Sequence, residues 1–440
     1  MNEIQILITF IIAIVVMIVM ISRFNLHPAL TLLIVIFFLG LSLGISGETT
    51  VDMINKGFGS TIGKVGLLFF LGCLLGKILE ETGAAVRITN WILKLVGNNK
   101  KRSIWAVALA SAILGIPILA DTIVIVLIPV ISNLAAKTGI SMMQYGTVLY
   151  LGAYVTASAV PPTPGPLAAA AFLNLDLSQA ILWGMIISIP GVIAGTYYVT
   201  KLTTYIPPKS EYVSNTEADI RINLIQSLAP IALPIILIFM ASMADSLPIG
   251  ETMNQFVKTI GNPIVAMMIA VIYSISLTGK KWRSKEVLND WAETGLRLAA
   301  MPIVVTGLGG ALALIIQDTK LAESMAQSIS SLPVPPVVIP FLIAALVNTI
   351  TGSNTLGVLT GAAIIEPLMA DLNLSPLAAY LACATGAQIF KHSNSSGFWV
   401  TVSLSGMNLG QGIKAVGGAT AVSGLVSGII VVILDYLGWI

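Results

Sequence analysis

The sequence predicts an all-α polytopic membrane protein, organised as two inverted-topology repeats with broken helices and re-entrant hairpins. Three observations predict it: an apolar composition, apolar segments interrupted by helix-breaking residues, and a weak internal repeat. The chain has 440 residues, of which 56% are hydrophobic and 10% are charged. A soluble domain typically carries about 25% charged residues. The composition therefore places most of the chain in a lipid bilayer.

The apolar segments divide into continuous and interrupted ones. About 20 apolar residues cross the hydrocarbon core. Continuous spans are expected at residues 4–22, 28–45, 64–79, 178–200, 224–243, 263–278, 298–316 and 413–437. Proline, glycine or polar residues interrupt four more segments, 103–136, 144–172, 335–369 and 376–405. These four are expected to be broken helices or re-entrant hairpins.

An internal repeat divides the chain in two. Residues 71–82 resemble residues 308–319, and Gly152 has a counterpart in Gly386 at nearly the same separation. We therefore expect a first repeat at 1–204, a cytoplasmic connector at 205–222 and a second repeat at 223–440.

Basic loops give an independent orientation. Lysine and arginine cluster at 94–102, 209–221 and 280–285. Loops rich in these residues stay in the cytoplasm. With all three clusters inside, the two halves cross the membrane in opposite directions, as inverted repeats require.

The first candidate site is the run Ala-Val-Pro-Pro-Thr-Pro-Gly-Pro at residues 159–166. Proline lacks an amide donor and blocks the preceding helical turn. Broken backbone at membrane depth has to be shielded from lipid, and in transporters it commonly builds the substrate site. A second polar break, at 391–397, lies at the matching place in the other half.

Hydroxyl and amide side chains around these breaks, and around a Gly-Ser segment near residue 353, are suited to an anion. Small polar residues beside glycine form nests of backbone amides. The alternative for the Gly-Ser segment is helix packing through small residues. The candidate substrate-binding residues are Ser158, Thr163, Gly165, Ser353, Asn354, Thr355, Asn394, Ser395 and Ser396.

Three titratable residues stand apart from the apolar background. Asp121 lies within an apolar segment, where an acid costs about 2.5 to 3.5 kcal/mol on insertion scales. It is a candidate for ion coupling, and the alternative is a helix N-cap at a re-entrant turn. His392, which titrates near neutral pH, is the second coupling candidate. Lys391 either neutralises an acidic substrate or extends its ammonium group to water.

The motifs resemble those of a known family. Residues 160–166 resemble the Pro-Pro-His-Pro-Gly-Pro motif of the gluconate permease family, within the ion transporter superfamily, and residues 392–399 resemble its His-x-Asn-Asp-Ser-Gly-Phe-Trp motif. Residues 119–129 and 352–355 match weaker family segments. The resemblance implies a bacterial inner-membrane importer of gluconate-like sugar acids or hydroxy acids, driven by proton symport. It also implies a homodimer and an elevator-type movement.

Two departures from the family pattern leave the coupling ion open. Thr163 replaces the family histidine, and Ser395 replaces the family aspartate. Hydroxyls and helix-end carbonyls could hold Na⁺ instead of a proton. The alternatives are thus a Na⁺-coupled carboxylate transporter and a passive anion channel or uniporter.

Several other classes are not expected. The chain has no Gly-x-Ser-x-Gly or His-Glu-x-x-His motif, which argues against an enzyme. A net charge of +2 gives no basis for a nucleic-acid partner, and two histidines and two cysteines argue against a metal site. We expect no cofactor other than the coupling ion, H⁺ or Na⁺.

Overall fold

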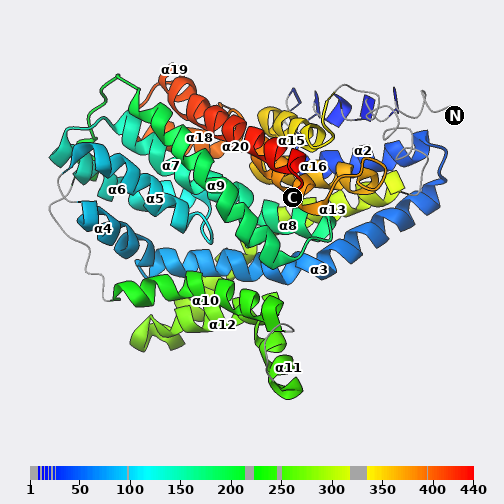
Figure 1. Ribbon diagram of the computed structural model, residues 1–440, viewed down its shortest axis with the longest axis horizontal. Coiled ribbons are helices and arrows are strands. Elements are labelled where there is room, and N and C mark those ends of the chain that lie inside the picture. Colours follow the sequence, from blue (N-terminus) through cyan, green and yellow to red (C-terminus); the bar gives the residue numbers. More distant parts are fainter. Residues whose placement is uncertain are drawn as a thin grey trace.

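The protein is a bundle of helices in which long helices enclose several shorter, broken ones (Figure 1). This computed structural model describes residues 26–96, 99–213, 222–244, 250–317, 334–393 and 395–440, with short stretches of the first 24 residues. Within these residues, six helices are long and apolar enough to cross a membrane, or up to seven if one bent pair forms a single span. The all-α polytopic class is confirmed.

In the first half, a long helix precedes the broken ones. Polar side chains cap several helix starts, with Ser46 before α3, Asn99 before α5 and Asp176 before α9. The helices are α2 (Pro28–Ser42), α3 (Gly47–Glu81), α4 (Ala84–Val96), α5 (Lys100–Leu114), α6 (Ala120–Thr138), α7 (Met142–Ala159), α8 (Pro164–Phe172) and α9 (Leu177–Thr200).

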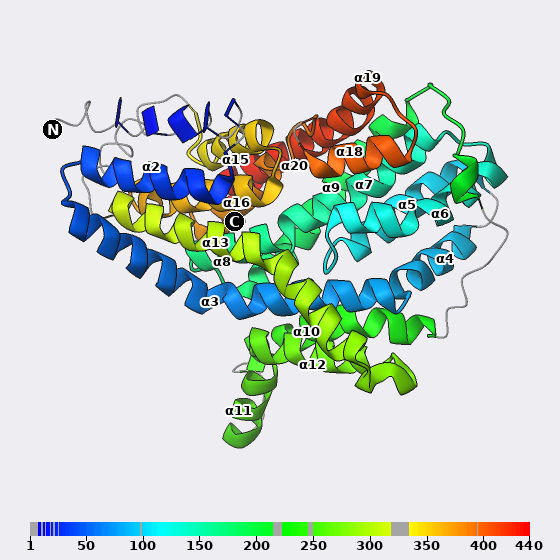
Figure 2. The ribbon, with the colours of Figure 1, turned by 180° about the vertical axis from the view of Figure 1, so that it is seen from behind.

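The second half begins with three helices and then follows much of the same order. These three are α10 (Leu224–Met243), α11 (Glu251–Ile260) and α12 (Pro263–Ser276), and they lie on the outer side of α3 (Figure 2). The remaining helices are α13 (Trp291–Gln317), α15 (Val338–Thr351), α16 (Asn354–Ile365), α17 (Pro376–Gly386), α18 (Ser396–Leu404), α19 (Leu409–Gly412) and α20 (Gly418–Tyr436).

All four interrupted segments are broken, as predicted. The breaks separate α5 from α6, α7 from α8, α15 from α16, and α17 from α18. Two predicted spans start too late: the one expected from residue 298 belongs to α13, which starts at Trp291, and the one expected from residue 64 belongs to α3, which starts at Gly47 and has 35 residues. At 1.5 Å per residue it is about 52 Å long, well beyond the thickness of the hydrocarbon core. The charged residues in its first turns hid this extension from a hydropathy argument.

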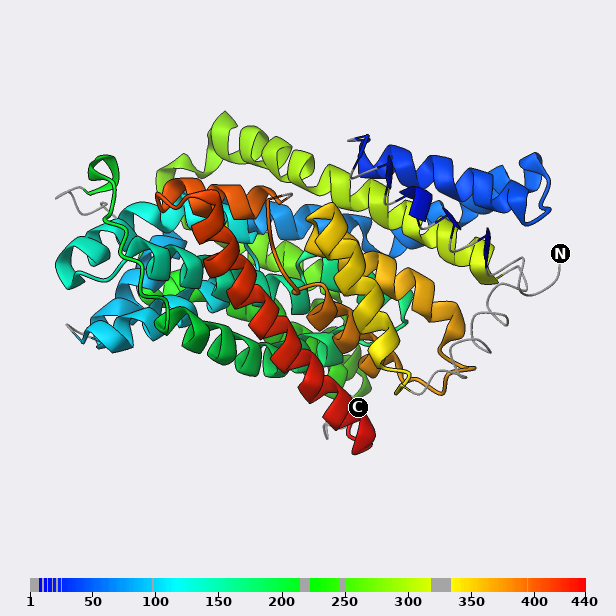
Figure 3. The same ribbon diagram turned by 90° about the horizontal axis from the view of Figure 1, so that it is seen from above.

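Corresponding helices of the two halves pack against each other in opposite directions. A side chain on Gly57 of α3 would collide with the Gly310 backbone of α13, whereas Gly295 near the start of α13 lies against Leu74 near the end of α3. Helices α9 and α20 also pack against each other in opposite directions. Helix α20 crosses the molecule diagonally in Figure 3. The Ser427 hydroxyl donates to the Ile187 carbonyl at 3.1 Å, and the Tyr198 hydroxyl donates to the Lys414 carbonyl at 2.7 Å.

This antiparallel packing is the arrangement that inverted repeats require. The broken helices also pack across the two halves: α6 of the first half contacts α18 of the second, and α16 of the second half contacts α8 of the first. The boundaries of the repeats and of the connector stay predictions. Only residues 205–213 and residue 222 of the connector belong to the described part of the chain.

Candidate functional site

The broken helices meet at two points inside the bundle. At each point the N-terminus of a hairpin arm from one half contacts the N-terminus of a short helix from the other: α6 meets α18, and α16 meets α8. A helix N-terminus carries about half a positive charge and several amides without helical partners. Each meeting point therefore favours an anion.

Asp121 occupies the first meeting point. It is half-buried in the first turn of α6, and the Ser396 hydroxyl at the start of α18 donates to its Oδ2 at 2.7 Å. A side chain added to Gly397 would collide with the Asp121 carboxylate and lie 2.8 Å from the Tyr150 hydroxyl oxygen. The alternative prediction, that Asp121 is a helix N-cap, is wrong, because the N-cap residue of α6 is Leu119.

At the second meeting point, no acidic side chain of the described residues contacts the polar groups that meet there. Ser353 caps α16, its hydroxyl accepting from the Leu356 amide at 3.3 Å. The Asn354 side-chain amide donates to the Ser158 hydroxyl at 3.0 Å, which in turn donates to the Tyr154 carbonyl at 2.7 Å. Hydroxyls, amides and two helix N-termini thus meet without a protein carboxylate.

Short helix α8 approaches this point through its first residues. Thr163 is buried, and its hydroxyl donates to the Val160 carbonyl at 2.6 Å. A Cβ on Gly165 would lie 3.1 Å from the Thr355 Cα, so the absence of a side chain allows α8 to contact α16. Gly165 was predicted to let backbone approach a ligand, and in the structure it lets backbone approach backbone.

Two buried tyrosines bind the carbonyl ends of the broken helices across the two halves. The Tyr154 hydroxyl of α7 donates to the Ala387 carbonyl beyond α17 at 2.7 Å. The Tyr380 hydroxyl of α17 donates to the Ala159 carbonyl of α7, also at 2.7 Å. Sequence reasoning missed both, because a tyrosine within an apolar run is usually a packing residue.

The basic residues of the second break hold the tip of hairpin α15–α16. The Lys391 ammonium group donates to the Gly352 carbonyl, and His392 Nε2 lies 2.7 Å from the Thr349 carbonyl oxygen. Since a carbonyl only accepts, His392 Nε2 carries the hydrogen. Lys391 is 2% exposed, so its ammonium group does not extend to water.

The structure brings some predicted residues together and separates others. Asp121 contacts Ser396, and Ser158 contacts Asn354. Buried Ser395 is the N-cap of α18, but its side chain makes no hydrogen bond to the helix that it precedes. His392 contacts the tip of the α15–α16 hairpin and not Asp121. Asn394 lies outside the described residues.

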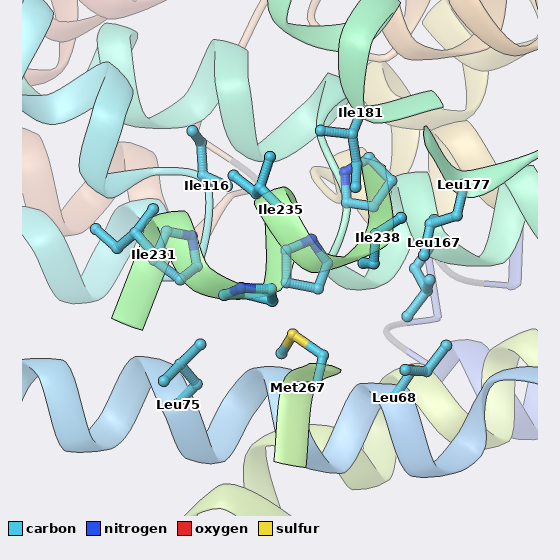
Figure 4. Close-up of a pocket in the computed structure, with 14 residues that line it drawn as sticks. Leu68, Leu75, Ile116, Leu167, Leu177, Ile181, Ile231, Ile235, Ile238 and Met267 are labelled. Atoms are coloured by element: carbon cyan, nitrogen blue, oxygen red, sulfur yellow. The ribbon is translucent and has the colours of Figure 1, made fainter. Parts of the chain in front are cut away.

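Two small pockets adjoin the first break. The pocket in Figure 4 lies between α3, α10 and α12 on one side and the breaks at Pro117 and Pro162 on the other, and the side chains that line it are apolar. It does not suit an anion. The neighbouring pocket is lined by Thr122, Thr163 and Lys77, among others.

Lys77 belongs to α3 and is one of the residues that line this second pocket. It forms ion pairs with Glu80 at 3.4 Å and Glu81 at 2.5 Å, within the same helix. The described residues contain no group of three His, Cys, Asp or Glu side chains that could hold a metal ion.

Comparison with known proteins places the chain among permeases. A sequence model of the GntP family permeases matches residues 5–437. A gluconate permease of Pseudomonas aeruginosa is 30% identical, over 94% of each chain. The high-affinity gluconate transporter of Escherichia coli is 28% identical, over 92% of this chain and 93% of the relative. The L-idonate transporter of the Escherichia coli Gnt-II system is 26% identical, over 90% and 92%.

A solved structure supports the fold. The YdaH transporter of Alcanivorax borkumensis aligns with a TM-score of 0.55 at 15% identity, covering 89% of this chain and 88% of that one. The bacterial relatives are permeases and transporters, one of them named an inner membrane permease. The predictions of a non-enzymatic transport protein of the bacterial inner membrane are confirmed.

Proposed function

The chain belongs to the GntP permease family, and we propose that it is a secondary active symporter that imports gluconate or a related sugar acid by alternating access. One observation carries the proposal: two pairs of helix N-termini converge inside the bundle, and among the described residues a carboxylate occupies the first pair and none occupies the second. The second pair offers the same field to the carboxylate of a substrate.

The substrate's carboxylate would bind where α16 and α8 meet. The amides that start α16 and the side chains of Ser158, Asn354 and Thr355 offer hydrogen bonds there. A polyol chain needs many further donors and acceptors, and Ser353, Thr163, Asn394, Ser395 and Ser396 are proposed to supply them.

Asp121 is proposed to couple transport to an ion. It is held by one hydroxyl, so it can take up a proton or contact a cation without breaking an ion pair. His392, bound to a carbonyl through Nε2, is proposed to orient the hairpin tip. Proton symport is the family expectation, and the hydroxyls of Thr163 and Ser395 keep Na⁺ as the alternative. The homodimer and the elevator-type movement are proposals that rest on the family resemblance.

Uptake into proteoliposomes tests the proposal. Purified protein is assayed with labelled gluconate and other sugar acids, with a proton gradient and a Na⁺ gradient applied separately. We expect accumulation above the outside concentration under one gradient and none without it. Flux that stops at equal concentrations under both gradients would identify a channel or uniporter and overturn the symport proposal.

A further inference from the structure

Lys391 is a buried cation that the proposed function leaves without a role. Its ammonium group donates to the Gly352 carbonyl and lies 5.1 Å from the centre of the Tyr154 ring. Its backbone amide is fixed by the Thr420 hydroxyl at 3.0 Å. With 2% of its surface exposed, the charge is shut off from water.

The charge of Lys391 is not neutralised by contact with an acid. Within the described part of the chain, no carboxylate forms an ion pair with it. The Asp121 carboxylate accepts from the Ser396 hydroxyl instead. A carbonyl and an aromatic face solvate an ammonium group partly, but a buried charge without a counter-ion costs several kcal/mol.

Holding the hairpin tip does not require this charge. His392 already binds the same turn through the Thr349 carbonyl, and the Asn348 side chain binds the Ile389 carbonyl at 2.8 Å. These contacts join the tip to the second break through groups that need no charge. A neutral donor in place of Lys391 could bind the Gly352 carbonyl at a lower desolvation cost.

The ammonium group lies next to the proposed substrate position. Gly352, which accepts from it, directly precedes Ser353 and Asn354 at the start of α16. Tyr154, whose ring faces the ammonium group, offers its carbonyl to Ser158, which also contacts Asn354. The uncompensated charge and the acid-free meeting point therefore belong to one connected cluster.

We propose that Lys391 supplies the fixed positive charge that neutralises the substrate's carboxylate, an inference that rests on the proposed function and names its charge-selecting residue. The helix N-termini orient the anion, and Lys391 distinguishes an acid from a neutral polyol. Loss of one partner of a buried ion pair typically costs 3–5 kcal/mol, so an anion binds at least roughly 100-fold more weakly without the ammonium group.

Binding of gluconate and of glucitol, its uncharged analogue with the same carbon chain, tests the inference. Affinities are measured by calorimetry on the wild-type protein and on Lys391→Gln, Lys391→Met and Lys391→Arg. Lys137→Gln, at the exposed end of α6, is the matched control for loss of a lysine. The melting temperature without ligand reports whether each variant is folded.

We expect gluconate binding to fall at least roughly 100-fold in Lys391→Gln and Lys391→Met, with weak glucitol binding unchanged. Lys391→Arg and Lys137→Gln should still prefer the acid. Equal gluconate binding by folded Lys391→Gln, or equal losses for gluconate and glucitol, would overturn the inference alone. If Lys391→Gln and Lys391→Met do not fold, failure of folded Lys391→Arg or of the wild type to prefer gluconate over glucitol overturns it. A wild-type protein that binds no sugar acid would overturn the proposed function as well.

Discussion

The two meeting points of broken helices share a geometry and differ in chemistry. Asp121 and Thr355 are each the second residue of a hairpin arm, and each lies against a glycine that is the second residue of the opposing short helix, Gly397 and Gly165. The first point holds a carboxylate, and the second holds hydroxyls and an amide. Under the proposed function, the two halves share one scaffold and divide its tasks: the first point supplies an acid for coupling, and the second supplies polar groups for the substrate's anion.

The largest effect is expected from Asp121→Asn, which removes the acid from the first point and makes the two points alike in charge. Asparagine has nearly the same shape, and its side-chain oxygen can still accept from Ser396. We expect gradient-driven accumulation of gluconate in proteoliposomes to be abolished, because the carboxylate proposed to carry the coupling ion is gone. Exchange of labelled for unlabelled gluconate should continue. Accumulation that survives the substitution would contradict a coupling role for Asp121.

The broken helices could be predicted from sequence because their signals are local. Prolines at 161–166 and the Gly-Ser pair at 352–353 interrupt apolar runs, and proline or glycine ends a helix by its own stereochemistry. The start of α3 could not be predicted, since Glu48, Asp52 and Lys56 lower its hydropathy while tertiary packing keeps it helical.

The contacts within the site could be predicted only in part. Clusters of polar residues in apolar segments pointed to Asp121, Ser158 and the start of α16. Their partners lie in the other half of the chain, where only the folded arrangement of antiparallel repeats brings them near. Nothing in the local sequence distinguishes Tyr154 and Tyr380, which bind carbonyls across the halves, from tyrosines that only pack.

Substitution of Gly397 and of Gly165 by alanine compares how tightly the two meeting points are packed. A methyl group on Gly397 would lie 2.8 Å from the Tyr150 hydroxyl oxygen and closer still to Asp121, whereas on Gly165 its nearest neighbour is the Thr355 Cα at 3.1 Å. Overpacking typically costs about 1–3 kcal/mol. We expect Gly397→Ala to lie at the upper end and to lose uptake, and Gly165→Ala at the lower end. Melting temperatures and initial uptake rates check the order, and a more severe Gly165→Ala would reverse the comparison.

Replacing Tyr154 and Tyr380 by phenylalanine tests whether their two hydrogen bonds between the halves stabilise the fold equally. Tyr380→Phe leaves the Ala159 carbonyl without its hydroxyl donor, and Tyr154→Phe does the same to Ala387. Leaving a buried acceptor unsatisfied costs about 1–3 kcal/mol. We expect similar losses of thermal stability, with gluconate affinity reduced further in Tyr154→Phe alone, since its hydroxyl also lies 3.5 Å from Asn348 in the second half. A stability loss confined to one variant would show that the two hydrogen bonds contribute unequally to stability.

The smallest effect is expected from His392→Gln, which separates the two candidates for ion coupling. His392 Nε2 donates to the Thr349 carbonyl, and the role proposed for His392 is to hold the hairpin tip through this bond. Glutamine can donate to the same carbonyl without titrating. We therefore expect accumulation within a few-fold of the wild type and an unchanged dependence on pH. If His392→Gln abolished accumulation while Asp121→Asn preserved it, coupling would belong to the second half, and the division of tasks between the halves would have to be exchanged.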